Sequence, residues 1–304
     1  MACFANKSKK GTFMGLFNFG LKKAEPQKHK KVKIGLALGG GGVRGIAHIG
    51  VLKAFEEAGI VFDLIAGTSA GSLIGAMWAG GKSASEMLEI AKSLKVKDIR
   101  KSKIFMPSKT DGLESLVTEN LGNIDINQLK IPFCAVAVDL VSSDEIVFSR
   151  GNVAKIVAGS CAVPGVFIPV EYEGMHLADG GLQNNIPSDV PRHFGCDYVV
   201  AVDVNSTRGE GTDSTKLLDV LKATIRIMSK SNCIKGYRNA DVVIQPNMRR
   251  YSSTKVEDVD GMYLEGYSAG KQAVREILDI ISHKQKREHR RRFAIISERK
   301  PRIL

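Results

Sequence analysis

The sequence lacks the features that most readily identify membrane-spanning, disulfide-stabilised and metal-binding proteins. No run of about 18 consecutive apolar residues occurs, which argues against a transmembrane helix. The five cysteines are odd in number and form no C-x-x-C pair, so neither a disulfide scaffold nor a zinc ribbon is predicted, and a reducing, cytoplasmic location is favoured. H-E-x-x-H and EF-hand patterns are also missing, so we expect no metal ion. Aspartates at predicted strand ends are interpreted as polar caps rather than cation ligands, namely Asp139, Asp203 and Asp241.

What is present is the composition of an ordinary globular protein with an excess of basic residues. Of the 304 residues, 43% are hydrophobic and 25% are charged, and the formal net charge is +12. These values exclude a disordered or collagen-like chain. At about 150 residues per domain, the length allows one large domain or two small ones.

The basic charge is concentrated at the two ends of the chain. Residues 1–33 contain nine lysines and one acidic residue, and residues 284–304 contain nine Lys or Arg and two acidic residues. The ends are either solvated tails or contacts with an anionic membrane, where each nearby cation contributes about 1 kcal/mol. Apolar residues among the N-terminal lysines, such as Phe13 and Phe17, suit a membrane interface. No signal peptide is predicted, because the apolar run is short and broken by glycines, and no motif for specific nucleic-acid binding is present.

Between the ends, short apolar runs alternate with segments of helical periodicity. Strands are predicted at 32–38, 62–67, 132–140, 145–149, 198–204 and 241–246, and helices at 44–58, 70–79, 84–94, 111–121, 152–158, 214–230 and 265–282. This alternation predicts a layered α/β fold with a mostly parallel sheet. We therefore expect an N-terminal tail at 1–31, one domain at 32–282 and a C-terminal tail at 283–304.

Four consecutive glycines follow the first predicted strand, in the sequence GGGGVRG at 39–45. Gly40, Gly42 and Gly45 match the dinucleotide-binding pattern G-x-G-x-x-G. The acidic residue that would bind a ribose is Asp63, which lies at the wrong end of the second strand, so a nucleotide-dependent oxidoreductase is disfavoured. The remaining interpretations are a tight turn and an anion-binding loop of backbone N–H groups.

The sequence GTSAG at 67–71 lies between a predicted strand and a predicted helix, which is the context of a nucleophile elbow. In such a turn, Gly67 and Gly71 avoid steric collisions, and the Ser69 hydroxyl is raised above the sheet where the helix dipole favours negative charge. A serine nucleophile also needs a base. None of the histidines that follow Ser69 has an evident partner.

Asp179-Gly180-Gly181 is by itself a common turn sequence. Together with the glycine loop and the serine elbow, however, it resembles the patatin-like phospholipase family. The resemblance covers residues 32–282 and leaves out both ends. It is carried by LALGGGGVRGIAHIGVLKAFEEAGI, GTSAGSLIGA, GSCAVPGVFIPV and LADGGLQNNIP.

The resemblance implies a three-layer α/β/α fold and a catalytic dyad, in which Ser69 is the nucleophile and Asp179 is the general base. It also implies an oxyanion hole formed by the N–H groups of Gly40, Gly41 and Gly42, with Arg44 positioning that loop. The implied substrate is a phospholipid or lysophospholipid, cleaved through an acyl-enzyme, and no cofactor is implied.

Two alternatives remain open. An acyltransferase or thioesterase would use the same acyl-enzyme with a different acyl acceptor or donor. A lipid- or acyl-binding protein would keep these residues with little turnover, although the intact motifs argue against it. The sequence does not predict the oligomeric state.

Overall fold

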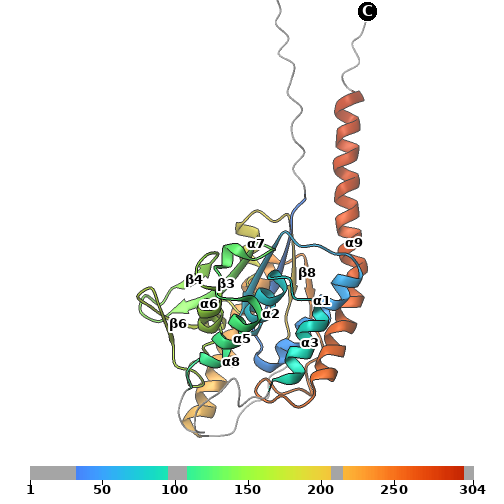
Figure 1. Cartoon of the computed structure of the whole chain (residues 1–304). Helices are drawn as coiled ribbons and strands as arrows, with labels where there is room; N and C mark the ends of the chain where they lie inside the picture. Colours follow the sequence, from blue (N-terminus) through green and yellow to red (C-terminus); the bar gives the residue numbers. More distant parts are fainter. Residues whose placement is uncertain (1–31, 95–107, 207–214, 298–304) are drawn as a thin grey trace, which may run out of the picture. The chain divides into compact units, whose positions relative to one another are not determined.

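The structure is a computed structural model that describes residues 32–94, 108–206 and 215–297 (Figure 1). The predicted N-terminal tail at 1–31 lies outside the described residues. Cys134, Cys161, Cys196 and Cys233 are buried free thiols. Within the described ranges, no helix combines the length and apolar character needed to cross a bilayer.

A mixed sheet of eight strands forms the centre of this domain. Five of its strands are parallel and lie in the order β3-β2-β1-β7-β8. They are β1 (Ile34–Leu38), β2 (Leu64–Thr68), β3 (Phe133–Asp139), β7 (Tyr198–Val202) and β8 (Val242–Ile244). Three antiparallel strands extend the sheet beside β3, namely β4 (Glu145–Phe148), β5 (Val170–Tyr172) and β6 (Met175–Asp179).

The pairing of β3 brings the ends of two distant strands together. β2 pairs with the first half of β3, β6 with its second half, and β4 with residues in both halves. Because a strand has only two hydrogen-bonding edges, β2 and β6 lie end to end along one edge and β4 occupies the other. Thr68, the last residue of β2, pairs with Val136, and Asp179, the last residue of β6, pairs with the next residue, Ala137. The two strand ends therefore meet.

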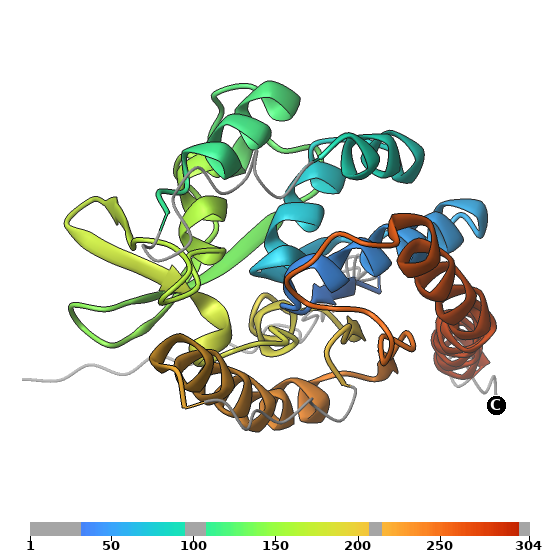
Figure 2. The ribbon, with the colours of Figure 1, turned by 90° about the horizontal axis from the view of Figure 1, so that it is seen from below.

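Helices cover both faces of the sheet, as Figure 2 shows. Along β1, Leu36 and Leu38 point into the larger core and Ala37 into the smaller one, as expected from the alternation of side chains in a strand. The larger core contains α1 (Ile46–Glu57), α2 (Ala70–Ala79), α3 (Ala84–Ser93), α5 (Asp111–Leu121), α6 (Val153–Ser160) and α9 (Val259–Ser297). The smaller core contains α7 (Asp189–His193) and α8 (Leu217–Asn239).

The structure confirms the predicted α/β fold, and each predicted strand has a counterpart. Two helices are longer than predicted: α8 continues to Asn239 rather than 230, and α9 spans Val259–Ser297 rather than 265–282. In α9, the Lys, Arg and Gln residues after 282 are good helix formers and sustain the helix although the apolar period fades. β5 and β6 have no counterpart among the predicted strands, and the three residues of β5 are too few to show a period.

Candidate active site

The GTSAG turn has the strained backbone of an elbow. Ser69 follows β2 and precedes α2, with φ 54° and ψ −127°, in a region that residues with a side chain rarely adopt. Such a conformation costs about 1–3 kcal/mol and persists only where its surroundings impose it. A Cβ on Gly71 would lie 2.0 Å from the Leu38 carbonyl oxygen, and one on Gly67 would lie 2.5 Å from the Gly71 oxygen. Both positions therefore require glycine.

Ser160, which the sequence did not indicate as a site residue, holds the backbone of the elbow through a side-chain hydrogen bond. Its hydroxyl accepts a hydrogen bond from the Ser69 N–H at 3.0 Å and donates one to the Val136 carbonyl at 2.6 Å. Ser160 is the last residue of α6 and is fully buried. A serine at a helix end carries no local pattern that reveals such a role, since its partners are distant in sequence.

Asp179 lies next to Ser69 because β6 ends where β2 ends. It is 5% exposed, and burial raises its pKa from 3.8 to about 6. Hydrogen bonds from the Ser69 side chain and from the Gly181 N–H, the latter at 2.8 Å, act in the opposite direction. The site thus contains a carboxylate in direct contact with the elbow serine, with a pKa that permits proton exchange near neutral pH.

The glycine loop is attached to the domain at three points. The Gly39 N–H donates to the Val202 carbonyl and the Gly40 N–H to the Asn185 carbonyl, each at 3.0 Å. The Val43 N–H donates to the Ser253 carbonyl, also at 3.0 Å. The N–H groups of Gly41 and Gly42 make no hydrogen bond within the described part of the chain. These two groups are available to a ligand, whereas that of Gly40 is engaged.

His48 supports the same loop. It is fully buried, its Nε2 lies 2.8 Å from the Gly39 carbonyl, and burial lowers its pKa to about 4. The ring is therefore neutral at pH 7, with the proton on Nε2, because a carbonyl can only accept. Its Nδ1 has no hydrogen-bond partner. His48 thus bonds the glycine loop rather than Ser69.

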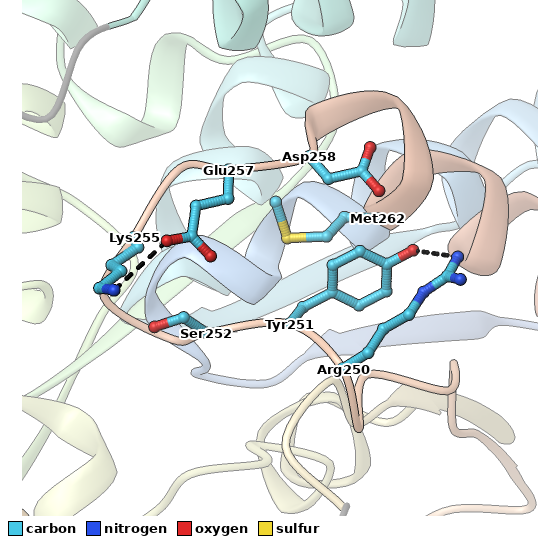
Figure 3. A pocket seen from close by; sticks show the side chains of 7 residues that line it. All are labelled: Arg250, Tyr251, Ser252, Lys255, Glu257, Asp258 and Met262. Carbon is cyan, nitrogen blue, oxygen red and sulfur yellow. Dashed lines mark hydrogen bonds and ion pairs between the residues drawn. The ribbon is translucent and has the colours of Figure 1, made fainter.

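Arg44 connects the glycine loop to the segment between β8 and α9. Its Nε donates to the Tyr251 carbonyl at 2.8 Å and its Nη1 to the Asn205 side chain at 2.9 Å. The same segment borders a cavity of about 170 Å³, whose lining includes neither Ser69 nor Asp179 (Figure 3). The lining residues are Arg250, Tyr251, Ser252, Lys255, Glu257, Asp258 and Met262.

The residues after Asp179 connect the parts of the site by hydrogen bonds, a role that the sequence did not indicate. The Asn184 carbonyl accepts from the Thr68 hydroxyl at 2.8 Å, and the Asn185 carbonyl accepts from Gly40. The segment LQNNIP thus connects the ends of β2 and β6 to the glycine loop. Its two asparagines were visible in sequence, but their partners lie more than a hundred residues away.

The strand-end aspartates act as polar caps. Asp139 accepts hydrogen bonds from the N–H groups of Val141, Ser142 and His176, and Asp203 accepts from the Asn205 N–H. Across residues 32–94, 108–206 and 215–297, no three His, Cys, Asp or Glu side chains are grouped so that they could bind a metal ion.

Known proteins are similar to the part of the chain that contains the candidate active site. The model of the family described as "Patatin-like phospholipase" matches residues 36–191. "Neuropathy target esterase sws" of Drosophila melanogaster is 32% identical over 210 residues, which are 66% of this chain and 14% of that protein. An "Uncharacterized NTE family protein" of Mycobacterium bovis is 36% identical over 182 residues, which are 58% of this chain and 50% of that protein. The chain thus spans half or less of the length of these two relatives.

Among solved structures, VipD from Legionella pneumophila has the same fold. Its TM-score is 0.56 at 15% sequence identity, covering 82% of this chain and 67% of VipD.

Proposed function

The chain belongs to the patatin-like phospholipase family, and on this premise we propose that it is a serine hydrolase of lipid acyl esters, of the phospholipase A or lysophospholipase type. The observation that carries the proposal is the contact between a strained, elbow-positioned Ser69 and a buried Asp179 whose pKa is about 6. A serine hydroxyl is a poor nucleophile unless a neighbouring base takes its proton, and Asp179 is adjacent to do so.

In the proposed first half-reaction, the Ser69 oxygen attacks the acyl carbonyl carbon while its proton moves to the Asp179 carboxylate. The resulting oxyanion accepts hydrogen bonds from the free N–H groups of Gly41 and Gly42, while Gly40 attaches the loop to Asn185. One such donor contributes about 2.7–4 kcal/mol to transition-state stabilisation in other hydrolases. The C–O bond to the leaving alcohol then breaks, the alcohol takes the proton from Asp179, and an acyl-Ser69 ester remains.

In the second half-reaction, a water molecule gives a proton to Asp179 and attacks the acyl-Ser69 carbonyl. Collapse of this intermediate releases the fatty acid, and the proton returns from Asp179 to the Ser69 oxygen. Since every proton transfer passes through Asp179, no histidine is needed, and His48 and Arg44 are positioning residues of the glycine loop.

We also propose that residues 32–282 form the catalytic domain of a cytoplasmic protein, and that the basic segments 1–33 and 284–304 contact anionic membranes peripherally. Each of the two segments contains nine basic residues, and cations near a membrane are attracted to anionic lipid, which supports this proposal. Faster turnover on anionic than on neutral vesicles, with the difference removed by salt, is the expected result.

The test of the proposed function is fatty-acid release from mixed neutral and anionic liposomes by wild type and Ser69→Ala. We expect release by the wild type and a loss of up to about 10⁶-fold in the variant, as in other serine hydrolases. Added alcohol acceptors and acyl thioesters distinguish transfer and thioesterase activity from hydrolysis of esters. Wild-type rates in Ser69→Ala would show that the proposed mechanism is wrong.

A further inference from the structure

Helix α8 exposes large apolar side chains along its outer side. Leu217, Val220, Ile227, Met228 and Ile234 are 42–82% exposed. Val220, Ile227 and Ile234 are spaced by seven residues, which is about two helical turns, so they form one stripe. α8 lies at the periphery in both views, and no described element covers its outer side (Figures 1 and 2).

The inner side of α8 is bonded to the turn that follows Asp179. The Ser229 hydroxyl donates to the Gly181 carbonyl at 2.9 Å, and the Asn232 side chain donates to the Leu182 carbonyl at 2.6 Å. Ser229 is buried, in contrast to the exposed stripe. α8 is thus fixed to the candidate active site on one side and presents its apolar stripe on the other.

The charge of α8 favours an anionic partner. Residues 217–239 contain five Lys or Arg and one acidic residue, Asp219. Lys230 and Arg238 are exposed beside the apolar stripe. Lys235 is paired with Glu145 at 3.0 Å and Asp189 at 2.7 Å, so the nearby carboxylates on β4 and α7 are engaged. Apolar side chains flanked by cations are the pattern of a helix that lies in the interface of an anionic bilayer.

We propose that the exposed face of α8 is a docking surface for anionic lipid bilayers. Docking there places α8 between the membrane and the turn after Asp179, so the candidate active site lies about one helix diameter, roughly 10–12 Å, from the bilayer that holds the substrate. In that respect the inference rests on the proposed function, whereas bilayer binding itself does not depend on turnover. The surface is distinct from the basic segments at the two ends of the chain.

The test is binding of the full-length protein to vesicles of phosphatidylcholine and phosphatidylglycerol (7:3), followed by flotation. All proteins carry Ser69→Ala so that no lipid is consumed. About 0.5 M salt screens the cations of the basic ends and of α8 alike, so the comparison between variants reports the apolar contacts. The variant is Ile227→Glu/Ile234→Glu. The matched control, Val61→Glu/Leu264→Glu, also replaces two exposed apolar residues. Val61 precedes β2, and Leu264 lies on α9, which covers the opposite face of the sheet from α8.

We expect the α8 variant to bind at least about tenfold more weakly than its parent and the control variant to bind like its parent. Equal binding by the α8 variant and its parent, or equal losses in both variants, would overturn the proposal. So would a parent dimer that the α8 variant converts to a monomer without changing vesicle binding, because the face would then be a self-association surface.

Turnover separates this proposal from the proposed function. In the active background, the ratio of vesicle turnover to turnover of a short-chain ester below its micellar concentration should fall about tenfold in the α8 variant. If neither substrate is hydrolysed by the wild type, the proposed function fails, and the flotation result still decides whether α8 docks on lipid.

Discussion

Ser160→Ala is expected to destabilise the domain far more than the loss of one hydroxyl normally does. The hydroxyl joins the Ser69 N–H at 3.0 Å to the Val136 carbonyl at 2.6 Å, in a fully buried position. Alanine leaves both backbone groups without this partner, and each buried unsatisfied group costs about 1–3 kcal/mol. We therefore expect the free energy of unfolding to fall by about 2–6 kcal/mol, which is a large part of a typical domain's stability.

The measurement is urea denaturation of wild type, Ser160→Ala and the control Ser188→Ala. Ser188 is also fully buried, but its hydroxyl has no hydrogen-bond partner. Removing that hydroxyl should leave the free energy of unfolding unchanged or raise it by about 1 kcal/mol. The folded state then no longer buries a polar group that lacks a hydrogen-bond partner. Equal losses in the two variants would refute the reasoning, since they would show that only the change of side chain matters.

Ser160→Ala also tests how the elbow is held. Without the bond from Ser69 N–H to Ser160, the strained φ of 54° loses one of its restraints. We expect kcat to fall while KM for a short-chain ester changes little, because the serine is misplaced but the acyl-binding surface is kept. A stable variant with wild-type kcat would show that the remaining contacts suffice.

Two further predictions concern the same site. The pKa of Asp179 is raised from 3.8 in an unfolded chain to about 6, so the folded protein binds this proton more tightly than the unfolded chain does. The free energy of unfolding therefore decreases as the pH rises from about 4 to about 6. At pH 8 the charged carboxylate therefore costs about 3 kcal/mol, and Asp179→Asn should unfold at a higher temperature than wild type by calorimetry while losing nearly all turnover. In the wild type, kcat/KM should fall about tenfold per pH unit below about 6, and a flat profile between pH 5 and 8 would contradict the role of Asp179 as base. Gly71→Ala should prevent stable folding, because its Cβ would meet the Leu38 carbonyl oxygen at 2.0 Å, whereas Gly59→Ala, with φ 64° and open space around it, should cost only about 1 kcal/mol in the same urea assay.

The elements that the sequence predicted well are those with local signals. Apolar runs such as 32–38 and 132–140 define strands, and glycine-flanked turns such as GTSAG define the connection between a strand and a helix. The resemblance to a family indicated that Ser69 and Asp179 belong together, and the structure places them in contact. Their meeting follows from the pairing of β2 and β6 with consecutive residues of β3, which no local pattern contains.

The supporting contacts of the site were not predictable for the same physical reason. Ser160 bonds Ser69 across 91 residues, and Asn184 bonds Thr68 across 116 residues. Side chains of this kind look like ordinary helix-end and turn residues until the fold brings their partners to them. The extension of α8 over residues 231–239 was missed for a different reason: Gly236 and the two asparagines, Asn232 and Asn239, are poor helix formers and locally indicate a helix end.

Labelling with a fluorophosphonate, followed by peptide mapping, tests most directly whether Ser69 is an activated nucleophile. The reagent phosphonylates a serine whose proton is taken by a neighbouring base. The account predicts a single modified peptide containing Ser69 in the wild type, slower labelling of Asp179→Asn, and slower labelling of the wild type below pH 6. Labelling of a different residue, or equal labelling of wild type and Asp179→Asn, would contradict it.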